Sequence, residues 1–225
     1  THQFKGRRKG GFVMTYSMLA SIVKYPFASQ LAGSHGKFGF FTLEKDSYQK
    51  VADELGIFCK SKPGEPLRYA RHPLVYMVEA ADDICYEIMD IEDSHKLKIL
   101  SYEETERLLL GFFDKETQNK IKERIKEEGV TDENEKVVYM RASAIGRLEN
   151  ECVTTFLEHE KEILAGTFEG SLIDHIAEQQ RNAYKECEKT SFAKIYHSKP
   201  VLLWRCLSMQ LSRPNVSTLN NCCDG

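Results

Sequence analysis

Apolar residues recur at intervals of three and four along most of the chain, and this periodicity constrains the fold more than any other feature. Residues 14–25, "MTYSMLASIVKY", carry apolar side chains at positions 14, 18, 19, 22 and 23. Similar spacing marks residues 41–57, 73–94, 101–113, 114–129 and 135–164, whereas no stretch keeps the apolar/polar alternation of a half-buried strand. The sequence therefore predicts an all-α fold.

Helix boundaries can be placed from residues that start or stop helices. Pro26 is expected to end the first helix, and Gly56 to cap the second. Pro73 suits the first turn of a long helix that runs to about Ser94. Ser101 lies three residues before Glu104, which is the spacing of a capping box. The loop at residues 60–66 contains two prolines and a glycine.

The chain of 225 residues is predicted to form one helical domain, or a large piece of one, over residues 1–200, followed by a polar tail at 201–225 that lacks periodicity and is expected to be disordered or divergent. A 41% share of apolar residues allows a core, and a net charge of −3 does not favour nucleic-acid binding by the whole chain. No apolar run reaches the roughly 20 residues that a membrane span needs. Seven cysteines without a CxxC pair indicate a reducing, cytoplasmic location.

The stretch "VEAADDICYEIMDIED" places acids along a helix that must also contribute to a core. Asp82, Tyr86 and Asp90 follow at intervals of four and share one face, which Glu79 extends by a turn. The apolar side is expected at positions 78, 81, 85, 88 and 89, so that a buried thiol is expected at 85. Two interpretations remain open: a solvated acidic face, or half of a site that uses carboxylates as metal ligands and hydrogen-bond acceptors.

The segment "RHPLVYMVEAADDICYEIMDIED" closely resembles part of the deoxyguanosine triphosphate triphosphohydrolases, which belong to the HD-domain superfamily. The segments "GGFVMTYSMLASIVKYP", "KFGFFTLEKDSYQKVADELGI", "ILSYEE" and "YMRASAI" also match, in family order from about residue 10 to 200. The resemblance implies an HD-type helical bundle that cleaves a deoxynucleoside triphosphate to deoxynucleoside and triphosphate.

The resemblance also implies roles for individual residues. Asp82 matches the family's last metal-binding aspartate, and Tyr86 and Asp90 match positions that face the sugar and base. Lys24 and Tyr25 match a Lys-Tyr pair that reaches substrate, and Arg141 matches an arginine that contacts phosphate. From the residues alone, Lys24 would be a helix-end cation and Arg141 an interhelical or surface ion pair. The implied cofactor is a divalent cation, Mg²⁺ or Mn²⁺.

The family's other metal ligands are an upstream histidine and a His-Asp pair, but none of the seven histidines here precedes an aspartate. The chain is therefore interpreted as the C-terminal portion of such an enzyme, with an incomplete metal site and no hydrolysis on its own. His72, one residue before Pro73, is interpreted as a helix-start residue rather than a substitute ligand, and His35 as a loop residue.

Other functions remain open. The chain could be a nucleotide-binding module of the HD superfamily without catalysis, or a helical oligomerisation piece; the sequence upstream of Thr1 would discriminate between these and an enzyme. Family members form homo-oligomers, which is expected here too. The basic segment "KGRRKGG" at residues 5–11 is either a solvated loop or a grip for phosphates, including those of single-stranded DNA.

Overall fold

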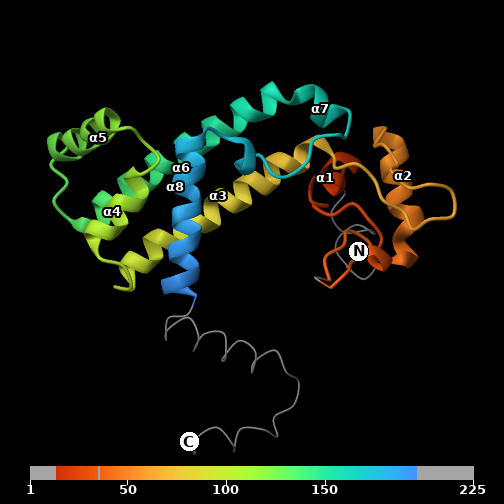
Figure 1. Ribbon diagram of the computed structural model, residues 1–225, viewed down its shortest axis with the longest axis horizontal. Helices are drawn as coiled ribbons and strands as arrows, with labels where there is room; N and C mark the ends of the chain where they lie inside the picture. The colour runs from red at the N-terminus through yellow and green to blue at the C-terminus, as the bar shows by residue number, and fades with distance from the viewer. Residues whose placement is uncertain (1–13, 35, 197–225) are drawn as a thin grey trace, which may run out of the picture. The chain divides into compact units, whose positions relative to one another are not determined.

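The computed structural model describes residues 14–34 and 36–196, and over these residues the chain is helical with only isolated β-bridges (Figure 1). The predicted all-α class is confirmed. The basic segment at residues 5–11, His35 and the predicted tail at residues 201–225 lie outside the described residues.

The chain divides into two compact units. The first unit comprises residues 1–85 and 145–181, and the second comprises residues 86–144 and 182–225. Two long helices, α3 (Pro73–Lys96) and α6 (Glu133–Glu158), contribute residues to both units (Figure 1).

In the first unit, α1 (Tyr16–Ser21) and α2 (Lys45–Leu55) flank an irregular segment with short 3₁₀ turns at Ser29–Leu31 and Thr42–Glu44. Aromatic side chains form the core beside α2: the rings of Phe40 and Tyr48 stack with centroids 4.6 Å apart, and Tyr69 lies against both. Gly56 caps α2 in the left-handed conformation, with φ of 66°, as its position in the sequence predicts.

Helix α1 is shorter than the predicted helix at residues 14–25. It ends at Ser21, and Lys24 and Tyr25 lie in an irregular turn before Pro26. The segment around Gly39 packs against this turn so closely that a Cβ atom on Gly39 would lie 2.2 Å from the Tyr25 carbonyl oxygen. Packing against residues distant in sequence therefore replaces the last predicted helical turn and fixes the backbone of Lys24 and Tyr25.

Helix α3 begins at Pro73, as predicted. The backbone N–H of Leu74 donates to His72 Nδ1 at 3.2 Å, which confirms His72 as a helix-start residue. The pKa of His72 is lowered by burial. Since Nδ1 accepts this hydrogen bond only in the neutral ring, the low pKa and the capping bond support each other.

The predicted apolar side of α3 is largely wrong. Of the five predicted positions only Ile88 is buried; Ala81 and Cys85 are exposed, as are Val78 and Met89 at 45% each. The buried apolar face instead comprises Val75, Tyr76, Ala80, Ile84, Ile88 and Ile91. Three glutamates, Glu79, Glu87 and Glu92, are buried as well.

On α6, Val138 is 39% exposed, whereas Val137, Met140, Ala144 and Leu148 are buried. In the first unit, α6 is followed by α7 (Glu160–Leu164) and a 3₁₀ turn at Ile173–His175. The loop between them is attached to α3 by Tyr76, whose hydroxyl donates to the Phe168 carbonyl oxygen at 3.0 Å.

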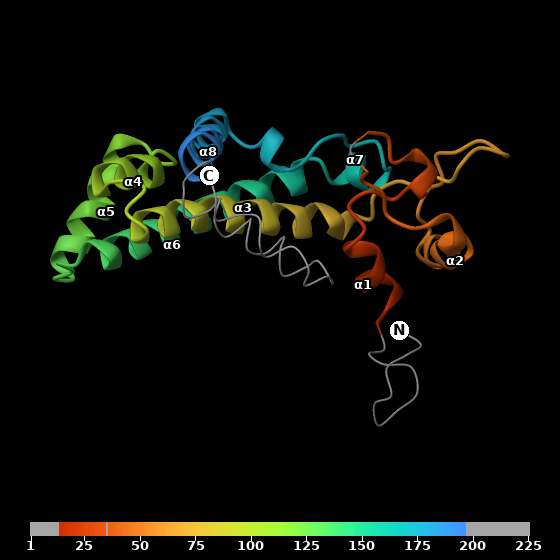
Figure 2. The same ribbon diagram turned by 90° about the horizontal axis from the view of Figure 1, so that it is seen from below.

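The second unit contains α4 (Tyr102–Leu110), α5 (Lys115–Glu127), most of α8 (Glu178–Thr190) and a π-helical turn at Ser191–Ile195. Ser101 caps α4 through the Glu104 backbone N–H at 3.2 Å, as predicted, but the Glu104 side chain pairs with Lys194 at 2.6 Å instead of completing the capping box. Helices α4 and α5 lie side by side, joined by an ion pair between Glu106 and Lys122 at 2.7 Å (Figure 2).

No helix of the described segments combines the length and the apolar content that crossing a membrane would need.

Candidate functional site

Lys24 and Tyr25 lie at a pocket of about 500 Å³ in the first unit. Lys24 is half-buried, and its Nζ atom is 3.0 Å from Glu79 Oε1 and 3.9 Å from Asp83 Oδ1, both on α3. Burial alone would lower the pKa of Lys24, but the hydrogen bond and the negative charges of Glu79 and Asp83 outweigh it and raise the pKa. Lys24 is therefore a fixed ammonium group at the pocket.

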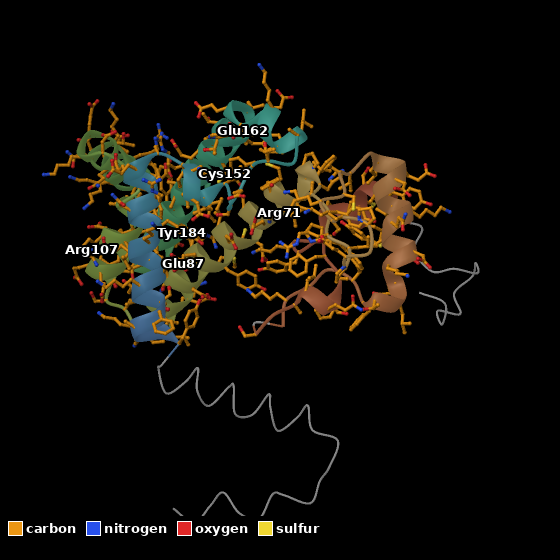
Figure 3. All side chains as sticks on the ribbon, turned by 45° about the vertical axis from the view of Figure 1, so that its right-hand side comes forward. Arg71, Glu87, Arg107, Cys152, Glu162 and Tyr184 are labelled. Atoms are coloured by element: carbon orange, nitrogen blue, oxygen red, sulfur yellow. The ribbon has the colours of Figure 1, made fainter. Side chains whose placement is uncertain are left out.

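Glu79 holds two cations at once. Its side chain is only 8% exposed, and its second oxygen, Oε2, accepts a hydrogen bond from Arg71. The Arg71 side chain is labelled in Figure 3. Arg71 also donates to the Gly170 carbonyl oxygen at 3.0 Å, and its guanidinium lies 4.5 Å from the ring centroid of Tyr76. A buried carboxylate with two charge-assisted partners is a satisfied group, so the structure accounts for Glu79 without a ligand.

Four basic side chains and several aromatic rings meet at this pocket. Its lining consists of Lys24, Tyr25, Pro26, Phe27, Lys60, Arg68, Tyr69, Arg71, Tyr76, Glu79, Asp83, Phe168, Gly170, Ser171 and Asp174. A second hollow of similar size beside α2 is lined by Asp46, Gln49, Lys50, Asp53 and Glu54, which offer neither an aromatic face nor a cluster of cations. The chemistry of the first pocket suits an anion that also carries a flat or apolar group.

The acids of α3 separate into two neighbouring faces. Glu79, Asp83 and Glu87 follow at intervals of four, and the first two lie at the Lys24 pocket. Asp82, Tyr86 and Asp90 form the adjacent face, as the sequence predicts. Glu79 therefore does not extend the Asp82 face; it belongs to the face beside it and is used by Lys24 and Arg71.

Asp82 and Tyr86 are exposed, Tyr86 at 68%, and neither makes a hydrogen bond or an ion pair with any described residue. Asp90 is half-buried and accepts a hydrogen bond from the Tyr196 hydroxyl at 2.7 Å in the second unit. The pKa of Tyr196 is raised by burial and by this bond to Asp90. Asp82 and Tyr86 are thus available to a ligand, whereas Asp90 already has a protein partner.

Arg141 lies on the α6 portion of the second unit. Its Nη1 atom is 2.6 Å from Oε2 of Glu92, a buried carboxylate that also pairs with Lys96 at 2.6 Å. Burial alone would raise the pKa of Glu92, but Lys96 and Arg141 together lower it. Arg141 Nε is buried without a hydrogen-bond partner among the described residues. The structure thus shows Arg141 in an interhelical ion pair, the alternative that the sequence offers for it.

A divalent cation would find only part of its ligands here. Asp82 offers carboxylate oxygens, which Mg²⁺ and Mn²⁺ prefer. Among residues 14–34 and 36–196, however, no three His, Cys, Asp or Glu side chains gather closely enough to hold a metal ion. The described residues therefore do not by themselves fit a complete metal site.

The whole chain matches no family model. A deoxyguanosinetriphosphate triphosphohydrolase-like protein of Pseudomonas aeruginosa (strain LESB58) is 32% identical over 203 residues, which are 88% of this chain and 43% of that protein. A protein of the same description from Synechocystis is 34% identical over 204 residues, 87% of this chain and 43% of the relative. The chain is related to the deoxyguanosinetriphosphate triphosphohydrolase family. A deoxyguanosinetriphosphate triphosphohydrolase of Yersinia pestis (strain Pestoides F) is 26% identical over 179 residues, or 72% of this chain and 34% of that protein.

The chain spans less than half the length of the family members it matches. A match that covers most of this chain but a minority of each relative agrees with the resemblance to one portion of these proteins.

Several residues of the Lys24 pocket were not predicted from the sequence. Arg71 and Glu79 are paired although they are eight residues apart, and Lys60 and Arg68 lie in what the sequence marks only as a loop and its flank. The Tyr196–Asp90 bond joins residues 106 positions apart. Arg71 lies two residues before the start of α3, and this position is the local signal from which its pairing with an acid of the first turns of that helix could have been predicted.

Proposed function

We propose that the chain supplies the substrate-binding side, and one metal ligand, of an enzyme that hydrolyses dGTP or another deoxynucleoside triphosphate to deoxynucleoside and triphosphate. The relatives are named deoxyguanosinetriphosphate triphosphohydrolase or a protein like it, and the chain covers only part of their length. The observation that carries the proposal is the contrast on α3: Glu79, Glu87 and Glu92 are buried with partners, whereas Asp82 and Tyr86 are exposed and have no hydrogen-bond or ion-pair partner in the described part of the chain.

In this proposal each side chain acts through ordinary contacts. The Lys24 ammonium binds phosphate oxygens, and Tyr25 shapes the pocket beside it. The Tyr86 ring packs against the deoxyribose, and the Asp90 carboxylate accepts a hydrogen bond from a sugar hydroxyl. Arg141 contributes to phosphate binding once its pairing with Glu92 rearranges.

Asp82 would hold a Mg²⁺ or Mn²⁺ ion, which would supply charge neutralisation at the phosphate under attack. The remaining ligands would come from residues beyond those described, since the described part holds no three-ligand cluster.

A binding experiment with two probes tests this assignment. We expect the purified chain to bind dGTP weakly in calorimetric titration, with a Kd of about 1 mM, since only part of the site is present. Tyr86→Ala and Asp90→Asn should weaken binding of dGTP but leave binding of inorganic triphosphate unchanged, because neither residue is assigned to phosphate. Lys24→Ala should weaken both. Binding of dGTP that is unaffected by Tyr86→Ala and Asp90→Asn would contradict the proposal.

A second candidate is a nucleotide-binding module without hydrolysis, which the absence of a three-ligand cluster among the described residues favours. The substrate contacts would be the same. Release of triphosphate from dGTP by the longest polypeptide that contains this sequence, in Mn²⁺ buffer, separates the two: only the enzyme produces it.

A further inference from the structure

The loop between α2 and α3 carries two like charges placed side by side. Cys59 and Tyr69 form an antiparallel bridge, and one residue further in, the Lys60 backbone N–H donates to the Arg68 carbonyl oxygen at 2.8 Å. Lys60 and Arg68 are therefore directly opposite each other on two extended segments that are joined by this isolated bridge. Like charges in that position destabilise the pairing, so this arrangement has a cost to folding.

No described acid compensates these two cations. Lys60 and Arg68 are exposed, and neither forms an ion pair within residues 14–34 and 36–196. The Arg68 guanidinium instead lies 5.0 Å from the ring centroid of Phe27, which fixes its direction. Both side chains line the same pocket as Lys24.

The inner part of the pocket is arranged differently. There, the two cations share the buried carboxylate of Glu79, and both terminal nitrogens of Arg71 are engaged, by Glu79 and by the Gly170 carbonyl oxygen. Lys24 Nζ lies 3.0 Å from Glu79 Oε1 and 3.9 Å from Asp83 Oδ1, and the side chain remains 38% exposed, so the ammonium group keeps donors for a ligand. Arg71 is thus fully engaged, Lys24 is held in place but keeps donors for a ligand, and Lys60 and Arg68 have no acidic partner among the described residues.

We propose that this pocket binds the phosphate chain of the nucleotide, with Lys60 and Arg68 as phosphate contacts in addition to Lys24, and with Arg71 and Glu79 as positioning residues that hold the Lys24 ammonium in place. The proposal rests on the proposed function, because that function supplies a triphosphate. Lys24, Lys60 and Arg68 come from three separate segments, and a chain of several phosphate groups can pair with all three. A single phosphate group bound by Lys24 would leave Lys60 and Arg68 without an anionic partner.

The central experiment measures binding of inorganic triphosphate to the purified chain by isothermal titration calorimetry at low salt. We expect the double variant Lys60→Ala/Arg68→Ala to bind about tenfold more weakly, since it loses two charge-assisted contacts at an exposed site. The matched control is Lys62→Ala/Lys161→Ala, which removes the same charge from exposed positions of the first unit that do not line the pocket. The control should remain within twofold of the unmodified chain. Equal weakening in both double variants would overturn the proposal, because it would show a general charge effect.

The melting temperature provides a second readout, because a purely structural role of Lys60 and Arg68 predicts that their replacement lowers it. Removing two opposed like charges should leave the melting temperature of Lys60→Ala/Arg68→Ala unchanged or slightly higher. A lower melting temperature together with unchanged triphosphate binding would assign the two residues to folding and overturn the proposal.

Two further outcomes separate this inference from the proposed function. If dGTP binding depends on Tyr86 and Asp90 but triphosphate binding ignores Lys60 and Arg68, the inference fails while the function stands. If triphosphate binding depends on Lys60 and Arg68 but dGTP binds no differently in the Tyr86 and Asp90 variants, the phosphate pocket stands and the proposed function fails. Binding of a single-stranded oligonucleotide through Lys60 and Arg68, with no binding of triphosphate, would also overturn the inference.

Discussion

Replacing Arg71 should destabilise the first unit far more than replacing Lys24, although both pair with Glu79. In Arg71→Met, the Glu79 carboxylate, 8% exposed, keeps only Lys24, 3.0 Å away. Breaking a buried ion pair costs about 3–5 kcal/mol when a charge is left alone, and the remaining lysine offsets part of that, which leaves about 2–3 kcal/mol. Loss of the guanidinium from the Tyr76 ring adds about 1 kcal/mol. We therefore expect a loss of about 3–4 kcal/mol in the free energy of unfolding.

The Lys24→Met variant is the comparison. The Lys24 side chain is 38% exposed, and Glu79 retains Arg71, so we expect a loss of about 1 kcal/mol or less. Urea titrations followed by circular dichroism measure both free energies, and adding Glu79→Gln to each variant completes a double-mutant cycle that isolates the coupling. If the losses in free energy of unfolding for Arg71→Met and Lys24→Met agree to within about 0.5 kcal/mol, then Arg71 is not the main partner of Glu79 and the reasoning is refuted.

The remaining predictions concern pH, a competing contact and activity. Burial raises the pKa of Glu87 despite its hydrogen bond from Ser191, so the folded chain keeps a proton that the unfolded chain releases above about pH 4.5; stability should therefore fall as the pH rises from about 4.5 through the raised pKa. Glu87→Gln should remove this loss in urea titrations at several pH values, while the exposed Glu123→Gln should retain it. Tyr196→Phe frees Asp90 and should tighten dGTP binding about fivefold in calorimetry, as expected for one competing hydrogen bond; unchanged or weaker binding would contradict this. The purified chain with dGTP and Mn²⁺ should release no triphosphate above a no-enzyme control, and release well above that control would show that the chain alone completes the site.

The elements could be predicted because helix signals are local. Pro73 begins α3, Ser101 caps α4 and Gly56 ends α2, and in each case the deciding residue lies within a turn of the boundary. The end of α1 failed because it is not local: the packing of Gly39 against the Tyr25 carbonyl displaces the last turn, and no pattern within residues 14–25 reports that contact.

The faces of α3 could not be predicted for a related reason. Its apolar residues occur all around the helix, so periodicity alone does not select which of them are buried. The structure buries three glutamates, each with a partner outside α3: Glu79 with Arg71, Glu87 with Ser191 and Glu92 with Arg141. These partners lie 8, 104 and 49 positions away, so the pattern within the helix does not reveal them; only the second partner of Glu92, Lys96, lies at a local i,i+4 spacing.

These pairings change how the acids of α3 should be interpreted. A buried carboxylate without a partner would be costly, so each buried glutamate requires its Arg, Lys or Ser partner for folding, and its residue type follows from that requirement. Asp82 is exposed and forms no hydrogen bond or ion pair with the described residues, so folding places no such requirement on it. The sequence alone left both a solvated face and a half-site open for the acidic pattern. Since the structure assigns structural partners to Glu79, Glu87 and Glu92, the half-site interpretation now depends on Asp82 and Tyr86, with Asp90 available once its bond to Tyr196 is released.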